Sequence, residues 1–266
     1  MGWIETRDAR LWVEVDGEGE PVTVVAHGLT NNRLELAMLT PFMPGTKVRF
    51  DFRGHGRSSA PEDPGAFRFA DFARDLDAVA RAYDARVAVG TSLGAGAVAH
   101  LLVADPGRFD RSVWLMPAGL DSEFGFIERY DRLAAEFDSA DAALHEVDEH
   151  PERVREMLRA PWMAGLDPNM WTHDDPAGLA RAIRGVVRDH PIADRELLRG
   201  VTSPVLLVCV DGDPIHPVEL GRVLHSLLPN SELLVYGSGE ELFQAIPDLL
   251  PKVVGFQADM SHTHLY

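Results

Sequence analysis

Short apolar runs alternate along this chain with longer stretches in which apolar residues recur every three or four positions. The runs predict strands, most of them apolar throughout, as is typical of parallel strands buried on both faces. The longer stretches have the spacing of amphipathic helices. Alternating strands and helices predict an α/β fold with a doubly wound, mostly parallel sheet. We expect strands at 11–15, 22–26, 47–51, 86–89, 112–116, 205–210 and 232–236, and helices at 71–83, 218–228 and 241–256.

The stretch from 121 to 199 breaks this alternation. It has no strand pattern, but several helical segments separated by prolines, at 124–137, 140–149, 151–159 and 177–188. We therefore expect a helical lid at 121–199, inserted into an α/β core formed by 1–120 and 200–266. Trp162 and Trp171 lie in an apolar part of this insertion, where they either line the mouth of a pocket or pack the insertion onto the core.

The net charge of the chain limits the kinds of partner that it can bind. The 266 residues include 42 acidic and 25 basic side chains, a formal net charge of −17, which disfavours nucleic acid and anionic membrane surfaces. No stretch approaches the roughly 20 apolar residues of a membrane-spanning helix, and a single cysteine permits no disulfide within the chain. We expect a cytoplasmic protein with a small-molecule substrate. Its basic residues are nearly all arginine, a bias that suggests a GC-rich bacterial genome.

The motif Gly90-Thr91-Ser92-Leu93-Gly94 carries the most specific chemistry in the sequence. It follows an apolar run and precedes a run of small residues with helical character, which predicts a strand, a sharp turn and a helix. Such a G-x-S-x-G turn lifts its serine out of the backbone as a nucleophile, and it needs glycines because a Cβ there would collide with neighbouring backbone. An ordinary turn with serine as a helix cap is the alternative.

Three further motifs stand in order around Ser92. They are His27-Gly28-Leu29 after the second strand, the D-x-R-G-x-G-x-S turn at 51–58, and Asp213 in the loop after the strand at 205–210. With the serine motif they make the chain resemble the α/β-hydrolase fold family over nearly its whole length. We assign the turn at 51–58 an architectural role only.

The resemblance implies roles for individual residues. Ser92 would be the nucleophile and Asp213 the orienting carboxylate, with Asp211 as a weaker candidate for that role. The backbone N–H groups of Leu29 and Leu93 would form the oxyanion hole, which stabilises the charge on a tetrahedral intermediate. His27 would hold the turn beside that site.

The expected histidine after the last strand is missing. That strand runs into a glycine-rich turn in which Glu240 occupies the position where the family places its proton acceptor. A carboxylate with an unperturbed pKa of ~4.3 is a weaker base than an imidazole near ~6.5. Two close carboxyl groups resist joint ionisation, so Glu240 and Asp213 would share a proton and titrate together.

Four histidines follow Asp213. His216 is expected near the site, but too close to Asp213 in sequence to bridge it to Ser92, and His225 falls within a predicted helix. His262 and His264 belong to a terminal tail that would have to fold back across the pocket. These considerations leave Glu240 as the predicted third catalytic residue.

The sequence therefore predicts an enzyme that uses Ser92 and an oxyanion hole on a small carbonyl compound, an ester, thioester or lactone. Two alternatives remain open on the same scaffold. One is a lyase, isomerase or cyclase with Glu240 and Asp213 as an acid/base pair, and the other is a catalytically silent small-molecule binder. No cofactor is implied, and no group of residues has a spacing that predicts a metal site.

Overall fold

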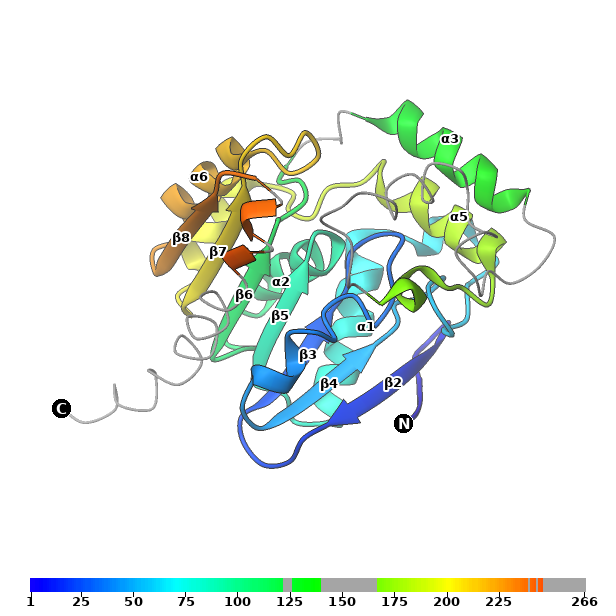
Figure 1. The fold of residues 1–266 in the computed structure, drawn as a ribbon, viewed down its shortest axis with the longest axis horizontal. Coiled ribbons are helices and arrows are strands. Elements are labelled where there is room, and N and C mark those ends of the chain that lie inside the picture. Colours follow the sequence, from blue (N-terminus) through cyan, green and yellow to red (C-terminus); the bar gives the residue numbers. More distant parts are fainter. Residues whose placement is uncertain (122–125, 140–166, 239, 243, 246–266) are drawn as a thin grey trace.

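A single eight-stranded sheet forms the centre of the molecule in the computed structural model, which describes residues 1–121, 126–139, 167–238, 240–242 and 244–245 (Figure 1). In spatial order the strands run β1-β2-β4-β3-β5-β6-β7-β8. β1 and β2 are antiparallel to their neighbours and the rest of the sheet is parallel. The strands are β1 Gly2–Glu5, β2 Arg10–Asp16, β3 Val22–Ala26, β4 Thr46–Phe50, β5 Val87–Thr91, β6 Arg111–Leu115, β7 Val205–Val210 and β8 Ser231–Tyr236.

The predicted α/β sheet is confirmed. All seven expected strands are present to within a residue or two, and every residue of β5 and β7 is buried, as continuous apolar runs require. β1 was missed, because its four residues form an edge strand whose side chains are alternately half-buried and exposed. So short an alternation gives almost no periodic signal.

The helices α1 Phe69–Ala82, α2 Leu93–Ala104 and α6 Val218–Leu227 belong to the described part of the α/β core. α1 buries one apolar stripe, as its spacing predicts, and packs against α2. α2 is buried along most of its length, and its small residues allow close approach to β3, β5 and β6. Ser92 joins β5 to α2, so the close packing of α2 on the sheet fixes the position of this candidate nucleophile.

The region expected to be a lid contributes two described α-helices, α3 Ile127–Asp138 and α5 Pro176–Val186, which pack against each other (Figure 1). The short 3₁₀ segments Pro168–Trp171 and Arg195–Gly200 flank α5. Helices predicted at 140–149 and 151–159 lie outside the described residues, as does most of the one predicted at 241–256. No described helix is both long and apolar enough to cross a membrane.

A buried ion pair joins the turn after β4 to α1. The Arg53 guanidinium donates to both carboxylate oxygens of Asp75, at 2.8 and 2.7 Å, and the two side chains are 1% and 0% exposed. The exposed Asp8 carboxylate also forms an ion pair with the Arg53 guanidinium, at 3.0 Å. The pair therefore ties the turn at 51–58 to the helical layer.

Replacing Asp75 by asparagine should lower the free energy of unfolding by about 3–5 kcal/mol, because it leaves a buried guanidinium without its bidentate partner. Urea unfolding followed by circular dichroism measures the loss. Glu5→Gln is the matched control, since its pair with Arg10 is exposed and should be worth less than about 1 kcal/mol. Equal losses in the two variants would contradict this assignment.

Candidate active site

Ser92 occupies a strained turn between β5 and α2. Its φ of 49° and ψ of −107° define a backbone conformation that residues other than glycine rarely adopt. A Cβ added to Gly90 would lie 2.5 Å from the carbonyl carbon of Gly94, and one added to Gly94 would lie 2.3 Å from the Ala26 oxygen. The steric reason for glycines in this motif is thus confirmed, and the turn presents its serine outward at the end of a central strand.

The side chain that meets Ser92 is His216. The Ser92 Oγ and His216 Nε2 are 2.8 Å apart, and the His216 Nδ1 lies 2.7 Å from Asp213 Oδ2. A carboxylate accepts, so Nδ1 carries the proton and the unprotonated Nε2 accepts from the serine hydroxyl. Ser92, His216 and Asp213 thus form a hydrogen-bonded chain with the arrangement that a nucleophile, a base and an orienting acid require.

The expectation that His216 lies too close to Asp213 to bridge it to Ser92 is wrong. Asp213 Oδ1 accepts from the backbone N–H groups of Ile215 and His216, at 2.8 and 3.2 Å, which closes a tight turn around the carboxylate. The turn brings the imidazole back onto the other oxygen of the same carboxylate. One aspartate therefore both shapes the loop and orients the base.

Hydrogen bonding governs the ionisation of Asp213. Partial burial alone would raise its pKa, but hydrogen bonds from the His216 ring and from the backbone of Ile215 and His216 outweigh burial, and the pKa of Asp213 is lowered. The carboxylate is thus ionised over the whole neutral range, as an orienting group must be.

Glu240 does not occupy the place predicted for it. Its side chain is exposed and accepts a hydrogen bond from the Gln244 amide at 3.2 Å, whereas the base on Ser92 is supplied by His216. Asp211, the weaker candidate for the orienting acid, is also exposed. Of the remaining histidines, His225 lies on α6 and contacts Ser231, while the tail pair falls outside the described residues.

Two backbone donors face the nucleophile region. Leu29 follows the His-Gly pair and Leu93 is the first residue of α2, and both line the same pocket as Ser92. Neither N–H group donates a hydrogen bond to another described residue. Free N–H groups at a turn and at a helix N-terminus are suited to an oxyanion. The pair predicted for that role is thus brought together with Ser92.

His27 acts on this region through the backbone. Its Nε2 accepts from the N–H of Phe52 at 3.0 Å, so its Nδ1 carries the proton and donates to the Gly28 oxygen at 2.8 Å. Because the C=O and N–H of a trans peptide point in opposite directions, holding the Gly28 oxygen fixes the direction of the Leu29 N–H. Burial, together with the nearby His55, lowers the pKa of His27 well below its usual value, so the ring stays neutral.

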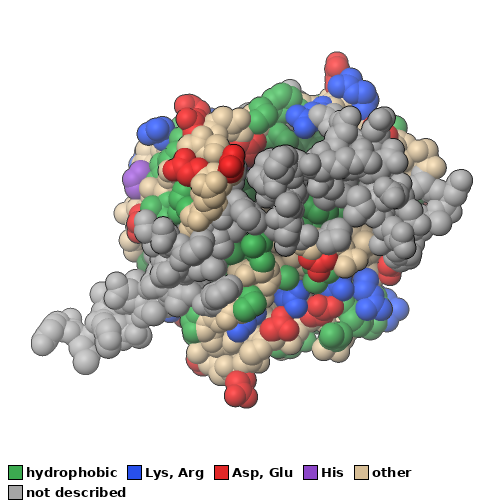
Figure 2. Space-filling view, viewed as in Figure 1, with side chains coloured by type: hydrophobic (Ala, Val, Ile, Leu, Met, Phe, Trp, Pro, Cys, Tyr) green, Lys and Arg blue, Asp and Glu red, His purple; other side chains and the backbone are tan. Residues whose placement is uncertain are grey.

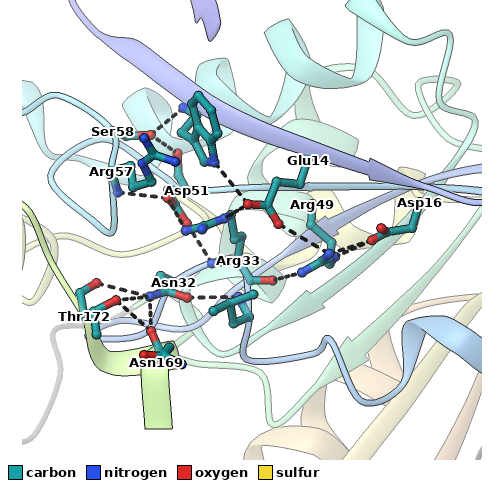
Figure 3. A network of polar contacts seen from close by, with 12 residues as sticks. Glu14, Asp16, Asn32, Arg33, Arg49, Asp51, Arg57, Ser58, Asn169 and Thr172 are labelled. Atoms are coloured by element: carbon teal, nitrogen blue, oxygen red, sulfur yellow. Dashed lines mark hydrogen bonds and ion pairs between the residues drawn. The ribbon is translucent and has the colours of Figure 1, made fainter. Parts of the chain in front are cut away.

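A polar network anchors the loop after Gly28 (Figure 3). Buried Asp51 accepts from the backbone N–H and the guanidinium of Arg33, at 2.8 and 3.0 Å, and from the N–H of Arg57. The Asn32 amide donates to the backbone oxygens of Asn169 and Thr172. The D-x-R-G-x-G-x-S turn is therefore architectural, as predicted, and it holds the loop that carries Leu29.

A small apolar pocket lies beside Ser92. Its walls come from both parts of the molecule, with Tyr130 of α3 and Val186 of α5 facing the turn that carries the nucleophile. Trp171 is buried in the core and is not part of this wall, so packing is its role. Trp162 lies outside the described residues. The lining residues are Leu29, Phe69, Ser92, Leu93, Ala118, Tyr130, Val186 and Val187.

Charged groups are interspersed on the face of the molecule shown in Figure 2, where acidic and basic side chains of the described residues lie beside one another. Several ion pairs among the described residues are exposed, such as that of Arg188 with Asp131. The described residues hold no group of three or more His, Cys, Asp or Glu side chains that could bind a metal ion. Cys209 is buried, which raises the pKa of its thiol to about 11 and makes it unreactive.

Comparison with known proteins agrees with this fold. Solved structures that resemble the chain include an esterase from Exiguobacterium antarcticum, at 17% identity and a TM-score of 0.75, covering 97% of this chain and 99% of that one. An enol-lactonase from Burkholderia xenovorans LB400 shares 19% identity, with a TM-score of 0.71 and coverage of 96% and 99%. A hydrolase from Pseudomonas aeruginosa PA01 shares 20% identity, with a TM-score of 0.76 and coverage of 97% and 98%.

No curated protein sequence matches the chain. At these identities the solved structures establish the fold, and the family follows from the sequence itself. The family model of the alpha/beta hydrolase fold matches residues 46–245, three quarters of the chain. The chain belongs to the alpha/beta hydrolase fold family.

Proposed function

We propose that this protein is a serine hydrolase that cleaves a small carbonyl compound, an ester, thioester or lactone. The observation that carries the proposal is the pair of contacts made by His216, 2.8 Å from the Ser92 hydroxyl and 2.7 Å from the Asp213 carboxylate. Similarity in fold to an esterase and an enol-lactonase is consistent with it. Because a fold supports many chemistries, the argument rests on the site.

The reaction begins with attack of Ser92 Oγ on the substrate carbonyl carbon. His216 Nε2 takes the hydroxyl proton as the bond forms, and Asp213 stabilises the resulting imidazolium. The carbonyl oxygen becomes an oxyanion within reach of the Leu29 and Leu93 N–H groups, each such donor being worth ~2.7–4 kcal/mol of transition-state stabilisation in other hydrolases.

Collapse of this tetrahedral intermediate breaks the bond to the leaving group. His216 returns its proton to the leaving oxygen or sulfur, and an acyl-enzyme remains on Ser92. Water then attacks the acyl carbon while His216 accepts its proton, and the second collapse releases the carboxylic acid and restores the serine hydroxyl. Every proton passes through the imidazole, so the chemistry needs no role for Glu240.

The walls of the pocket favour an apolar acyl or alcohol group. Seven of its eight lining residues are aliphatic or aromatic, and Ser92 supplies the polar function. We infer that 121–199 acts as the lid, because Tyr130, Val186 and Val187 supply part of the wall.

Turnover of a panel of short-chain phenyl esters, thioesters and lactones by the wild type and a Ser92→Ala variant tests the proposal. The wild type should hydrolyse at least one class, and Ser92→Ala should lose at least 10³-fold in kcat. Equal rates in the two proteins, or no turnover of any class, would overturn the proposed function.

A further inference from the structure

Glu35 is a carboxylate beside the proposed active site with no part in the chemistry described so far. It ends a loop that starts at His27 and closes on itself through the turn bond from the Asn31 N–H to the Gly28 oxygen, at 3.2 Å. The loop brings the Glu35 carboxylate back to Gly28, the residue directly before the oxyanion donor Leu29.

The carboxylate makes two hydrogen bonds, one from each end of that loop. Its Oε2 accepts from the Gly28 N–H at 2.6 Å, and its Oε1 accepts from the Asn31 side-chain amide. The peptide on the N-terminal side of Gly28 is thus held by Glu35, and the peptide on its C-terminal side is held by His27 through the Gly28 oxygen. Together the two contacts fix both peptide planes that determine where the Leu29 N–H points.

The carboxylate and the candidate nucleophile both border Gly28. A Cβ added to Gly28 would lie 3.3 Å from Glu35 Oε1 and 3.5 Å from the Cβ of Ser92. The Gly28 backbone is therefore closely packed by both Glu35 and Ser92.

We propose that Glu35 is a positioning residue of the hydrolytic site, whose ionised carboxylate holds the Gly28-Leu29 turn so that the Leu29 N–H meets the oxyanion of the transition state. This proposal rests on the proposed function. An ionised acceptor makes shorter and stronger hydrogen bonds than a neutral one, so the ionised form holds the turn most firmly.

Protonation of Glu35 would require the side-chain amide of Asn31 to reorient. A carboxylic O–H at Oε1 would face the amide N–H₂ of Asn31, donor against donor, unless that amide turned over. The Asn31 Oδ1 is buried without a hydrogen-bond partner among the described residues, so the turned amide would offer a free acceptor to the acid proton. The pair thus has two hydrogen-bonded arrangements, selected by one proton.

The surroundings of Glu35 bring the ionisation of its carboxyl group into the neutral pH range. Burial raises the pKa of Glu35 to about 7, against the opposing hydrogen bonds from Gly28 and Asn31. No described side chain forms an ion pair with Glu35. Arg33, on the same loop, is directed to Glu14 and Asp51, and neutral His27 uses both ring nitrogens.

His216 and Asp213 are the titratable groups on the other side of Ser92, and they belong to the base already described. The proposed positioning role requires Glu35 to be ionised, so the deprotonation of Glu35 should raise the activity as the pH rises.

The test is the pH dependence of kcat/KM between pH 5 and 9, on the best neutral ester from the panel, for the wild type and a Glu35→Gln variant. In the wild type, kcat/KM should rise through a deprotonation near neutral pH that belongs to Glu35. In Glu35→Gln this deprotonation should be absent, so the acid limb should be less steep than in the wild type. The kcat of Glu35→Gln at pH 8.5 should fall about 10- to 100-fold with KM nearly unchanged, because a misplaced donor acts only in the transition state. Glu62→Gln, at an exposed glutamate, is the matched control and should behave as the wild type.

An Asn31→Ala variant provides a second measurement should Glu35→Gln not fold. It removes a hydrogen bond that lowers the pKa of Glu35, so the Glu35-dependent part of the acid limb should move to higher pH. Wild-type turnover with an identical profile in both variants would overturn the role of Glu35 and leave the proposed function intact. Absence of turnover in the wild type would overturn both.

Discussion

Replacing His216 by alanine is expected to lower kcat by about 10⁴- to 10⁶-fold, with little change in KM. The variant keeps the nucleophile and the oxyanion donors but removes the group that takes the Ser92 proton, and a free serine hydroxyl is a weak nucleophile. Steady-state kinetics on the best ester measures the loss. Added imidazole should restore part of the rate by entering the space left by the missing ring.

His225→Ala is the matched control for this prediction. His225 lies on α6, is exposed and contacts Ser231. Its loss should leave kcat within about twofold of the wild type, because surface substitutions away from the site have small effects. A His216→Ala variant that retained more than a tenth of the wild-type kcat would exclude His216 as the base.

Replacing Asp213 by asparagine should lower kcat by about 10⁴-fold. An asparagine amide can present its N–H₂ to His216 Nδ1, which would then act as acceptor and force the ring proton onto Nε2. In that tautomer Nε2 donates toward Ser92 and is unable to accept its proton. The same carboxylate also accepts two backbone N–H bonds that shape the loop, so part of the loss would come from a displaced imidazole.

Asp211→Asn separates this effect from a general loss of acidic charge at the end of β7. Asp211 stands two residues earlier and is exposed, so its substitution should change kcat by less than about twofold. A larger loss of kcat in Asp211→Asn than in Asp213→Asn would show that Asp211, and not Asp213, is the orienting carboxylate.

Much of this arrangement could be predicted from the sequence, because it depends on local patterns. Continuous apolar runs define buried parallel strands, and the glycines flanking Ser92 satisfy a steric requirement that operates within a few residues. The Leu29 and Leu93 donors follow from their places next to two recognisable turns. The helices α3 and α5 were recognisable from the sequence of 121–199, while their relation to the pocket depends on contacts between distant segments such as Tyr130 and Val186.

The base was missed for a different reason. The motif order of the family places the base after the last strand, where Glu240 stands, and His216 is only three residues from Asp213, a separation that predicts no bridge to Ser92. A signal was present in Asp213-Pro214-Ile215-His216, because an aspartate that accepts from the N–H groups two and three residues later makes a tight turn. Such a turn returns the side chain of the third residue toward the carboxylate. Spacing along the chain is a poor guide to distance wherever the backbone reverses.

Glu35 could not be found from the sequence, because nothing in its neighbourhood marks it. It lies eight residues after His27 in a stretch with no catalytic motif, and its importance comes from a loop that closes on Gly28. The burial that raises its pKa to about 7 is likewise a property of the folded chain.

The rate at which a fluorophosphonate modifies Ser92 tests the central claim most directly, because the reaction needs the activated serine and no knowledge of the substrate. Intact-protein and peptide mass spectrometry would follow the wild type, His216→Ala, and Glu240→Gln as the control for the rejected base. We predict that wild type and Glu240→Gln are modified on Ser92 at equal rates, and that His216→Ala reacts at least 10³-fold more slowly. Rapid modification of His216→Ala together with loss of reaction in Glu240→Gln would contradict the account.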